Sequence, residues 1–379
     1  MSSPLLTQAD QALARGDVSA ARDLLAKASS DAPGDAQTWL KLAAMCRAAG
    51  DLSAALDAVH GALAAAPLDF TALLLRATLL ARLQRAEADE AFARALAQKP
   101  SGTLPPAIAG VVAQAEERVR VAAAAKETAL VQLGASAGRG ADPRIARFAS
   151  NIVRRTRPYH SEPTHYHYPG LIEREFHDRH RFPWLATLEQ GTATIRGEFE
   201  QLLATERAEL VPYVQYAAHE PLAQWKPLNH SRDWTAIHLL QNGRPVEANA
   251  GRCPRTMDLL RALPQPNVPG CSPNAMFSLL APGTHIPPHC GVANTRLVCH
   301  LPLVVPPQCW FRVGAETREW RCGEAFVFDD TIEHEAMNGS DTMRVVLILD
   351  VWHFDLDAAD RAAVSAMMAA DVGAADMGL

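Results

Sequence analysis

The first hundred residues repeat at a fixed interval, and this interval restricts the fold more than any other feature of the chain. Gly16 and Pro33 recur 34 residues later as Gly50 and Pro67, and alanines keep the same step. Glycine commonly ends a helix, and proline stops the helix that precedes it. The pattern therefore predicts stacked helical hairpins, each burying one face against its neighbours.

This repeat resembles the tetratricopeptide repeat (TPR), and the resemblance covers residues 1–100. Trp39 lies where such repeats carry the aromatic residue of their first helix, whereas Gln84 and Arg85 replace Gly-Asp in the third unit. The resemblance implies a concave groove that binds a peptide or protein. A scaffold or dimerisation element is the alternative.

The middle of the chain is expected to connect the repeats to a second domain. Residues 101–145 contain a long alanine-rich helical stretch followed by GASAGRGAD, and a helix followed by glycines is typical of a connector. Farther on, the apolar pattern of residues 184–206 predicts one amphipathic helix that covers a sheet. Asn242-Gly243 between apolar runs predicts a β-hairpin.

Composition excludes several classes of function. The net charge is -6 and no Lys/Arg run occurs, which argues against binding to nucleic acid or an anionic membrane. The seven cysteines form no C-x-x-C pair, which indicates reduced thiols. No apolar run approaches the ~20 residues of a membrane helix, so a cytoplasmic protein with no membrane span is expected.

Residues 277–353 consist of short apolar runs separated by turn residues, which predicts the strands of a sandwich or barrel around a small ligand. His289 and His334 fall at strand ends, and Arg344 begins the apolar run MRVVLILDVW. A buried arginine is costly unless it binds an anion. A small dicarboxylate is the expected partner.

Two imidazoles and a buried cation meet the needs of an iron(II)- and 2-oxoglutarate-dependent oxygenase. The imidazoles would hold Fe(II) with open positions, and 2-oxoglutarate would chelate the metal through its keto acid end. The arginine would bind the distal carboxylate, and O2 would take the remaining position.

Four motifs carry a family resemblance: PGTHIPPHCG, TRLVCHLPLVVP, FDDTIEHEA and LILDVWH. Together they resemble the aspartyl/asparaginyl β-hydroxylases, a branch of the 2-oxoglutarate oxygenases. The resemblance implies a two-domain α+β chain in which residues 146–358 form a double-stranded β-helix (jelly-roll or cupin-like) with flanking helices. Residues 359–379 are expected to be an alanine-rich tail.

The resemblance also implies roles for particular residues. His289 and His334 would bind the iron, and Arg344 with Ser278 would hold the distal carboxylate of 2-oxoglutarate. His300 would lie near the other end of the co-substrate. His289, His334 and Arg344 are thus the expected catalytic residues.

Two further positions bear on metal and substrate. Gly291 stands where ordinary members of the oxygenase class have a carboxylate ligand, which is itself a mark of this family. Arg296 matches an arginine near the substrate pocket, but Val298 replaces a second arginine of the animal members. An acidic substrate side chain would therefore not be held in the same way.

The expected reaction is hydroxylation of the β-carbon of an Asp or Asn residue in a peptide or protein that the repeats help to hold. One alternative is hydroxylation of a lipid acyl chain or a free amino acid, which Val298 makes credible. A non-catalytic TPR adaptor with a vestigial barrel is another.

Other polar residues of these regions are expected to be structural. The His160–His180 cluster matches no zinc spacing and is interpreted as a surface loop. Two prolines separate His285 from His289, so the pair cannot share a helical face. Asp329 and Asp330 are expected to form a turn.

Overall fold

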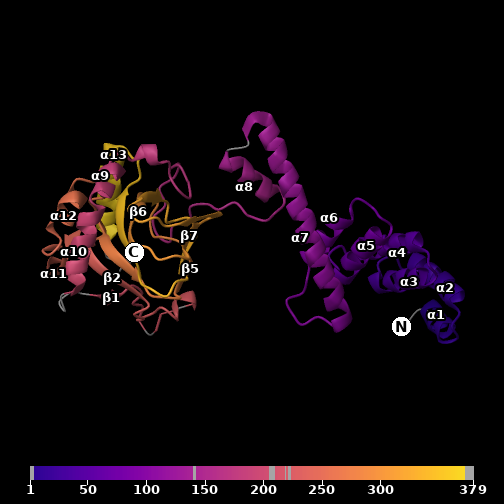
Figure 1. The fold of residues 1–379 in the computed structure, drawn as a ribbon. Coiled ribbons are helices and arrows are strands. Elements are labelled where there is room, and N and C mark those ends of the chain that lie inside the picture. The colour runs from indigo at the N-terminus through magenta and orange to yellow at the C-terminus, as the bar shows by residue number, and fades with distance from the viewer. Residues whose placement is uncertain (1–3, 140–141, 205–209, 218, 221–222, 372–379) are drawn as a thin grey trace. The chain divides into compact units, whose positions relative to one another are not determined.

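The computed structural model describes residues 4–139, 142–204, 210–217, 219–220 and 223–371. The chain divides into two compact units, residues 1–156 and residues 157–379 (Figure 1). The regular structure described in the first unit is helical, and the second unit contains antiparallel sheets. The predicted separation into a helical N-terminal part and a C-terminal part with a sheet core is confirmed.

The first unit is a series of helices in which each packs against the next. In chain order they are α1 (Pro4–Ala14), α2 (Val18–Asp31), α3 (Ala36–Ala48), α4 (Leu52–Ala65), α5 (Phe70–Arg82), α6 (Ala88–Leu96), α7 (Pro106–Gly134) and α8 (Pro143–Ile152). The alanine-rich helix predicted within residues 101–145 is α7, and α8, which begins at Pro143, was not predicted.

Aspartate caps account for the 34-residue period. The carboxylates of Asp17 and Asp51 accept hydrogen bonds from backbone N–H groups at the starts of α2 and α4, and Asp35 and Asp69 do so for α3 and α5. Each cap satisfies an N–H group that the helix leaves unpaired, typically contributing ~1 kcal/mol. The repeat therefore fixes where each helix begins.

The turn between α5 and α6 lacks both the glycine and the capping aspartate of the earlier hairpins. Gly16 and Gly50 adopt φ of 76° and 81°, and Gln84 takes the corresponding turn with φ of 54°. Glu87 precedes α6 without making a side-chain cap. A side chain at positive φ is strained, so this turn is the least favourable of the three.

The second unit contains a seven-stranded and a four-stranded sheet, both antiparallel. The larger has the order β1-β2-β4-β11-β6-β9 with β3 on β2, and the smaller has the order β5-β10-β7-β8. The strands are β1 (Val211–Pro212), β2 (Trp234–Gln241), β3 (Arg244–Pro245), β4 (Ala275–Leu280), β5 (His285–His289), β6 (Arg296–Val304), β7 (Cys309–Val313), β8 (Glu316–Glu319), β9 (Phe326–Phe328), β10 (His334–Asn338) and β11 (Arg344–Trp352).

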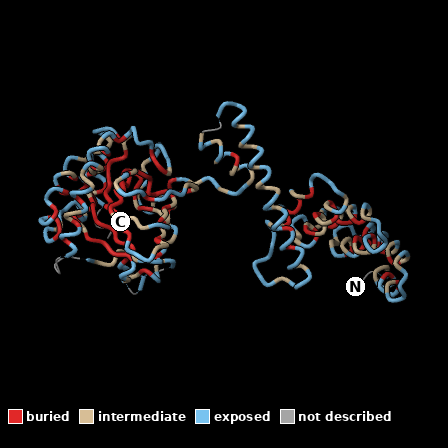
Figure 2. The backbone as a smooth tube through the Cα atoms, viewed as in Figure 1, coloured by how far each residue is buried: buried red, intermediate tan, exposed pale blue. Residues whose placement is uncertain are grey.

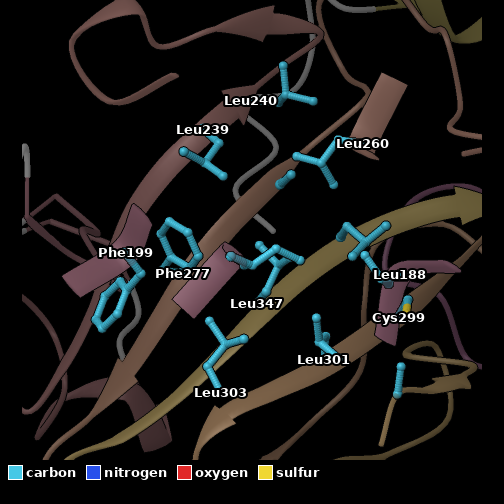
Figure 3. Close-up of a cluster of buried hydrophobic side chains, with 14 of the residues drawn as sticks. Leu188, Phe199, Leu239, Leu240, Leu260, Phe277, Cys299, Leu301, Leu303 and Leu347 are labelled. Atoms are coloured by element: carbon cyan, nitrogen blue, oxygen red, sulfur yellow. The ribbon is translucent and has the colours of Figure 1, made fainter. Parts of the chain in front are cut away.

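Helices cover one face of the larger sheet. Leu188, Phe199 and Leu260, from α9 (Leu185–Gln190), α10 (Thr192–Ala204) and α12 (Pro254–Arg261), belong to one buried cluster with Phe277 and Leu347 of the sheet (Figure 3). Burying a side chain of this size contributes roughly 1.5–3 kcal/mol. The helical cover predicted for residues 184–206 is therefore present.

That cover is two helices rather than the single one predicted. The chain breaks at Gly191, where an added Cβ would lie 2.5 Å from Cδ1 of Leu259. The Leu259 side chain of α12 therefore occupies the space beside this glycine. Residues 205 and 206 of the predicted helix lie outside the described residues.

The other face of the larger sheet meets the smaller sheet. Met276 and Leu280 of β4 share a buried cluster with Phe311 and Ala336 of the smaller sheet. Because side chains alternate along a strand, Ser278 lies on this same inner face. The residues of β11 are all buried, and Figure 2 shows the buried chain concentrated in these strands.

The remaining elements complete the second unit. The Asn242-Gly243 hairpin joins β2 to β3 as predicted, with φ of 51° and 81° at the two turn residues. Short helices are Arg179–Arg181, Ala223–Trp225 and α11 (Glu247–Ala250). Helix α13 (Ala358–Asp371) occupies most of the expected C-terminal tail, and residues 372–379 lie outside the described residues. Among the described residues, no helix combines the length and apolar character that a membrane crossing requires.

Candidate functional site

Strand pairing brings two distant histidines together. His289 ends β5 and His334 begins β10, and the antiparallel register places them directly opposite each other. Their ring centroids are 4.0 Å apart. Cross-strand neighbours of this kind are close enough to share one ligand. The pairing of β5 with β10 therefore creates a two-imidazole site between the sheets.

Backbone carbonyl groups orient both rings. Nδ1 of His289 lies 2.7 Å from the Pro287 carbonyl oxygen, and Nδ1 of His334 lies 3.1 Å from that of Ile332. These bonds assign the proton to Nδ1 and leave Nε2 with a free lone pair. Burial lowers the pKa of His289 to about 3 and that of His334 to about 4. Both imidazoles are neutral near pH 7 and could donate to a metal.

Arg344 provides a buried positive charge on the same inner face. It is 1% exposed, its guanidinium stands 4.9 Å from the Trp320 ring centroid, and its Nε has no hydrogen-bond partner. No described carboxylate forms a salt bridge with it. Burial lowers its pKa to about 10, so it remains charged. A buried cation without an anion is costly, which indicates a ligand carrying a negative charge.

Ser278 lies beside this guanidinium. Nη1 of Arg344 is 3.5 Å from both the carbonyl oxygen and Oγ of Ser278. Nε1–H of Trp234 donates to Oγ of Ser278 at 3.1 Å. Since Trp234 occupies an acceptor position on Oγ, the serine hydroxyl can turn its own proton toward a bound oxygen.

His300 is a further buried histidine, and it packs against the same two rings, Phe311 and Phe328, as His334 does. It is buried on β6 among Phe311, Phe328 and Trp320, and Nε1–H of Trp320 points at its Nδ1 over 3.4 Å. Its pKa falls well below the usual value because of burial and then because of the nearby Arg344 charge. It is therefore a neutral donor within the electrostatic reach of Arg344.

Arg296 does not stand free as a substrate cation. Its Nη2 forms a 3.0 Å ion pair with Oδ2 of Asp330, and both side chains are buried. An added Cβ at Gly291 would lie 2.1 Å from that oxygen. The Asp330 carboxylate thus fills the space that a side chain at position 291 would need, which explains why this position is glycine.

Asp329 and His285 have hydrogen-bond partners of their own outside the two-imidazole site. Asp329 has the expected turn role, since its Oδ1 accepts bonds from the backbone N–H and hydroxyl of Thr331. His285 pairs with Glu335 at 2.8 Å. Within the described residues no group of three or more His, Cys, Asp or Glu side chains could hold a metal, the His160–His180 cluster included.

The structure places His289 opposite His334, brings Ser278 and His300 near Arg344, and joins Arg296 to Asp330. Sequence reasoning missed the aromatic residues on the His289 side. The Trp225 ring is 5.0 Å from that of His289, and Tyr213 stacks on Trp234 at 3.7 Å. The only available signal was aromatic residues flanking a short strand, which is too common to single them out.

Two antiparallel sheets that hold two imidazoles and a buried guanidinium between them define a candidate site for a metal and an anion. Comparison with known families finds one similarity: residues 189–354 match the family model described as "Aspartyl/Asparaginyl beta-hydroxylase". The resemblance seen in the four motifs is thereby confirmed.

Curated relatives align over the same region. The human "Aspartyl/asparaginyl beta-hydroxylase" is 33% identical over 187 residues, covering 49% of this chain and 24% of that protein. The "Ornithine lipid ester-linked acyl 2-hydroxylase" of Rhizobium tropici is 34% identical over 186 residues, covering 48% and 62%. The matches therefore span less than two thirds of either relative.

Solved structures align with the helical repeats. The Sgt2 TPR domain from Aspergillus fumigatus is 22% identical, covering 32% of this chain and 82% of that one, with a TM-score of 0.28. A score this low supports no conclusion about function.

Proposed function

We propose that the second unit is an Fe(II)- and 2-oxoglutarate-dependent hydroxylase acting on an Asp or Asn residue of a peptide or protein. The observation that carries the proposal is Arg344, a buried guanidinium without a carboxylate partner among the described residues, on the same inner face as two cross-strand imidazoles. The double-stranded β-helix architecture expected from the family belongs to this proposal.

The side chains present fit the iron and its co-substrate. His289 and His334 each keep one ring nitrogen free, since the other is bonded to a backbone carbonyl. Such a bond fixes the tautomer of a metal-binding imidazole. The unpaired Nε of Arg344 and the hydroxyl of Ser278 suit the distal carboxylate.

The protein residues bind and orient while the cofactors carry the oxidation. When bound, iron and 2-oxoglutarate would supply oxygen activation, with succinate and carbon dioxide as co-products. His289 and His334 would hold the metal as neutral donors. Arg344 would neutralise the distal carboxylate, and the aromatic residues around His300 would exclude water from the reacting centre.

The substrate assignment rests on the family to which residues 189–354 are similar, whose name specifies Asp and Asn. We place peptide or protein binding in the helical repeats, so that they hold the segment flanking the target residue. The alternative role of the repeats is a scaffold.

A second candidate is hydroxylation of a lipid acyl chain, the reaction named for the Rhizobium tropici relative. The charges around Arg296 favour it, because this guanidinium is already paired with Asp330. Val298, which lies on the inner face of β6 between Arg296 and His300, is buried and apolar. Asp330 thus balances the charge of Arg296, and the co-substrate uses Arg344, which leaves an acidic target side chain less well held.

The test is succinate formation by anaerobically iron-loaded protein after oxygen is admitted. We expect wild-type protein to convert 2-oxoglutarate, and His289→Ala and Arg344→Ala to be silent. Adding Asp/Asn peptides in one arm and ornithine lipid in another should raise turnover in only one arm. A mass gain of one oxygen then identifies the substrate class. A silent wild type in every arm would leave the adaptor alternative.

The repeats have a separate test. If they hold a protein substrate, residues 157–379 alone should process short peptides but lose activity on long ones. A lipid hydroxylase should act equally well without the repeats.

A further inference from the structure

Strand β1, at the edge of the larger sheet, positions Tyr213 next to the candidate site. Tyr213 directly follows β1, and its backbone N–H donates to the Trp234 carbonyl at 2.9 Å. Its ring stacks on that of Trp234 with centroids 3.7 Å apart and planes at 9°. Tyr213 is partly buried and packs against the cluster between the two sheets, to which Trp234 also belongs.

Continuous contacts lead from Tyr213 to the buried guanidinium. Trp234, on which it stacks, donates to Oγ of Ser278 at 3.1 Å, and that oxygen is 3.5 Å from Nη1 of Arg344. The strand register also places Trp234 near Arg344, since both residues pair with Leu280, one from each side. Tyr213 is therefore linked through Trp234 to Ser278 and Arg344, the residues proposed to bind the distal carboxylate.

The phenolic hydroxyl has no hydrogen bond to any other described residue, although it lies within electrostatic reach of Arg296, Asp330 and Arg344. Burial raises the pKa of Tyr213 above its usual value, so it stays protonated and can donate. Tyr213 is only partly buried, so its hydroxyl is open to a bound ligand. A free hydroxyl that is linked through Trp234 and Ser278 to the unpaired Arg344 can donate to an anionic oxygen bound there.

We propose that the Tyr213 hydroxyl donates a hydrogen bond to the distal carboxylate of 2-oxoglutarate, alongside Arg344 and Ser278. The proposal rests on the proposed function. A carboxylate has acceptor positions for all three donors, and bonds from neutral donors to a charged acceptor are stronger than neutral pairs. Tyr213 adds affinity without adding another buried charge.

The experiment is calorimetric titration of 2-oxoglutarate into the full chain loaded with Mn(II), which binds without turnover. We expect Tyr213→Phe to raise the Kd for 2-oxoglutarate about 10-fold or more, in line with a lost bond to a charged group. The Kd for Mn(II) should stay within twofold. Tyr216→Phe, an exposed tyrosine of the same segment, is the matched control and should bind like wild type.

A second ligand separates a binding role from a packing role. 2-Oxobutanoate keeps the keto acid end but has no distal carboxylate, so wild type and Tyr213→Phe should bind it equally weakly. If Tyr213→Phe weakens both ligands alike, or binds 2-oxoglutarate as wild type does, the Tyr213 proposal is wrong while the proposed function stands. If Mn(II)-loaded wild type binds no 2-oxoglutarate, the proposed function itself fails.

Discussion

Gly291→Ala should destabilise the second unit through one added methyl group. The new Cβ would lie 2.1 Å from Oδ2 and 2.4 Å from Cγ of Asp330, distances that no real contact shows. Overpacking of this kind costs ~1–3 kcal/mol. If the carboxylate moves far enough to lose Arg296, 3.0 Å away, the cost rises towards the ~3–5 kcal/mol of a broken buried ion pair.

Urea unfolding followed by tryptophan fluorescence measures this cost. Gly197→Ala in α10 is the matched control, since its added Cβ meets open space; it should be neutral or stabilise by up to ~1 kcal/mol. In an Asp330→Ala background, Gly291→Ala should cost at least ~1 kcal/mol less, because the clashing carboxylate is gone. A Gly291→Ala protein within ~0.5 kcal/mol of wild type would refute the steric argument.

Three further outcomes are expected. Arg344→Met should leave the ligand-free protein at least as stable as wild type, by urea unfolding, but 2-oxoglutarate should no longer raise its Tm; Arg312→Met, which breaks pairs with Glu333 and Glu335, should lower stability. Metal-free protein should lose stability as pH falls below ~6.5, because the folded state holds His334 neutral with a pKa of about 4 while the unfolded state takes up the proton. This amounts to ~2 kcal/mol per such histidine at pH 5, and His334→Gln should flatten the dependence. Gln84→Gly should stabilise the first unit by ~1 kcal/mol in urea unfolding, since φ there is 54°; an unchanged or lower stability would contradict the strain argument.

Much of the fold was predictable because its signals are local. The 34-residue period follows from helix-capping aspartates such as Asp17 and Asp51, and the Asn242-Gly243 turn is fixed by the φ values it needs. The break in the helical cover was not predictable. At the break, Leu259 of another helix approaches Gly191, and no periodicity in residues 184–206 contains that contact.

Some residues of the candidate site were likewise predictable from the sequence, and others were not. His289, His334 and Arg344 stand out because imidazoles at strand ends and an arginine opening an apolar strand are unusual residues for those places. The pairing of Arg296 with Asp330, and the wall formed by Tyr213 and Trp225, depend on contacts between segments far apart in the chain. Spacing within a single sequence does not encode such contacts.

The most direct test of the central claim is an anaerobic titration of Fe(II) and then 2-oxoglutarate into the full chain, followed by the visible charge-transfer absorption of an iron(II)–keto acid chelate. The account predicts that wild type develops the band, that His334→Ala does not, and that Arg344→Ala needs far more 2-oxoglutarate to reach it. A wild-type protein that shows no band at saturating iron and 2-oxoglutarate would contradict the account.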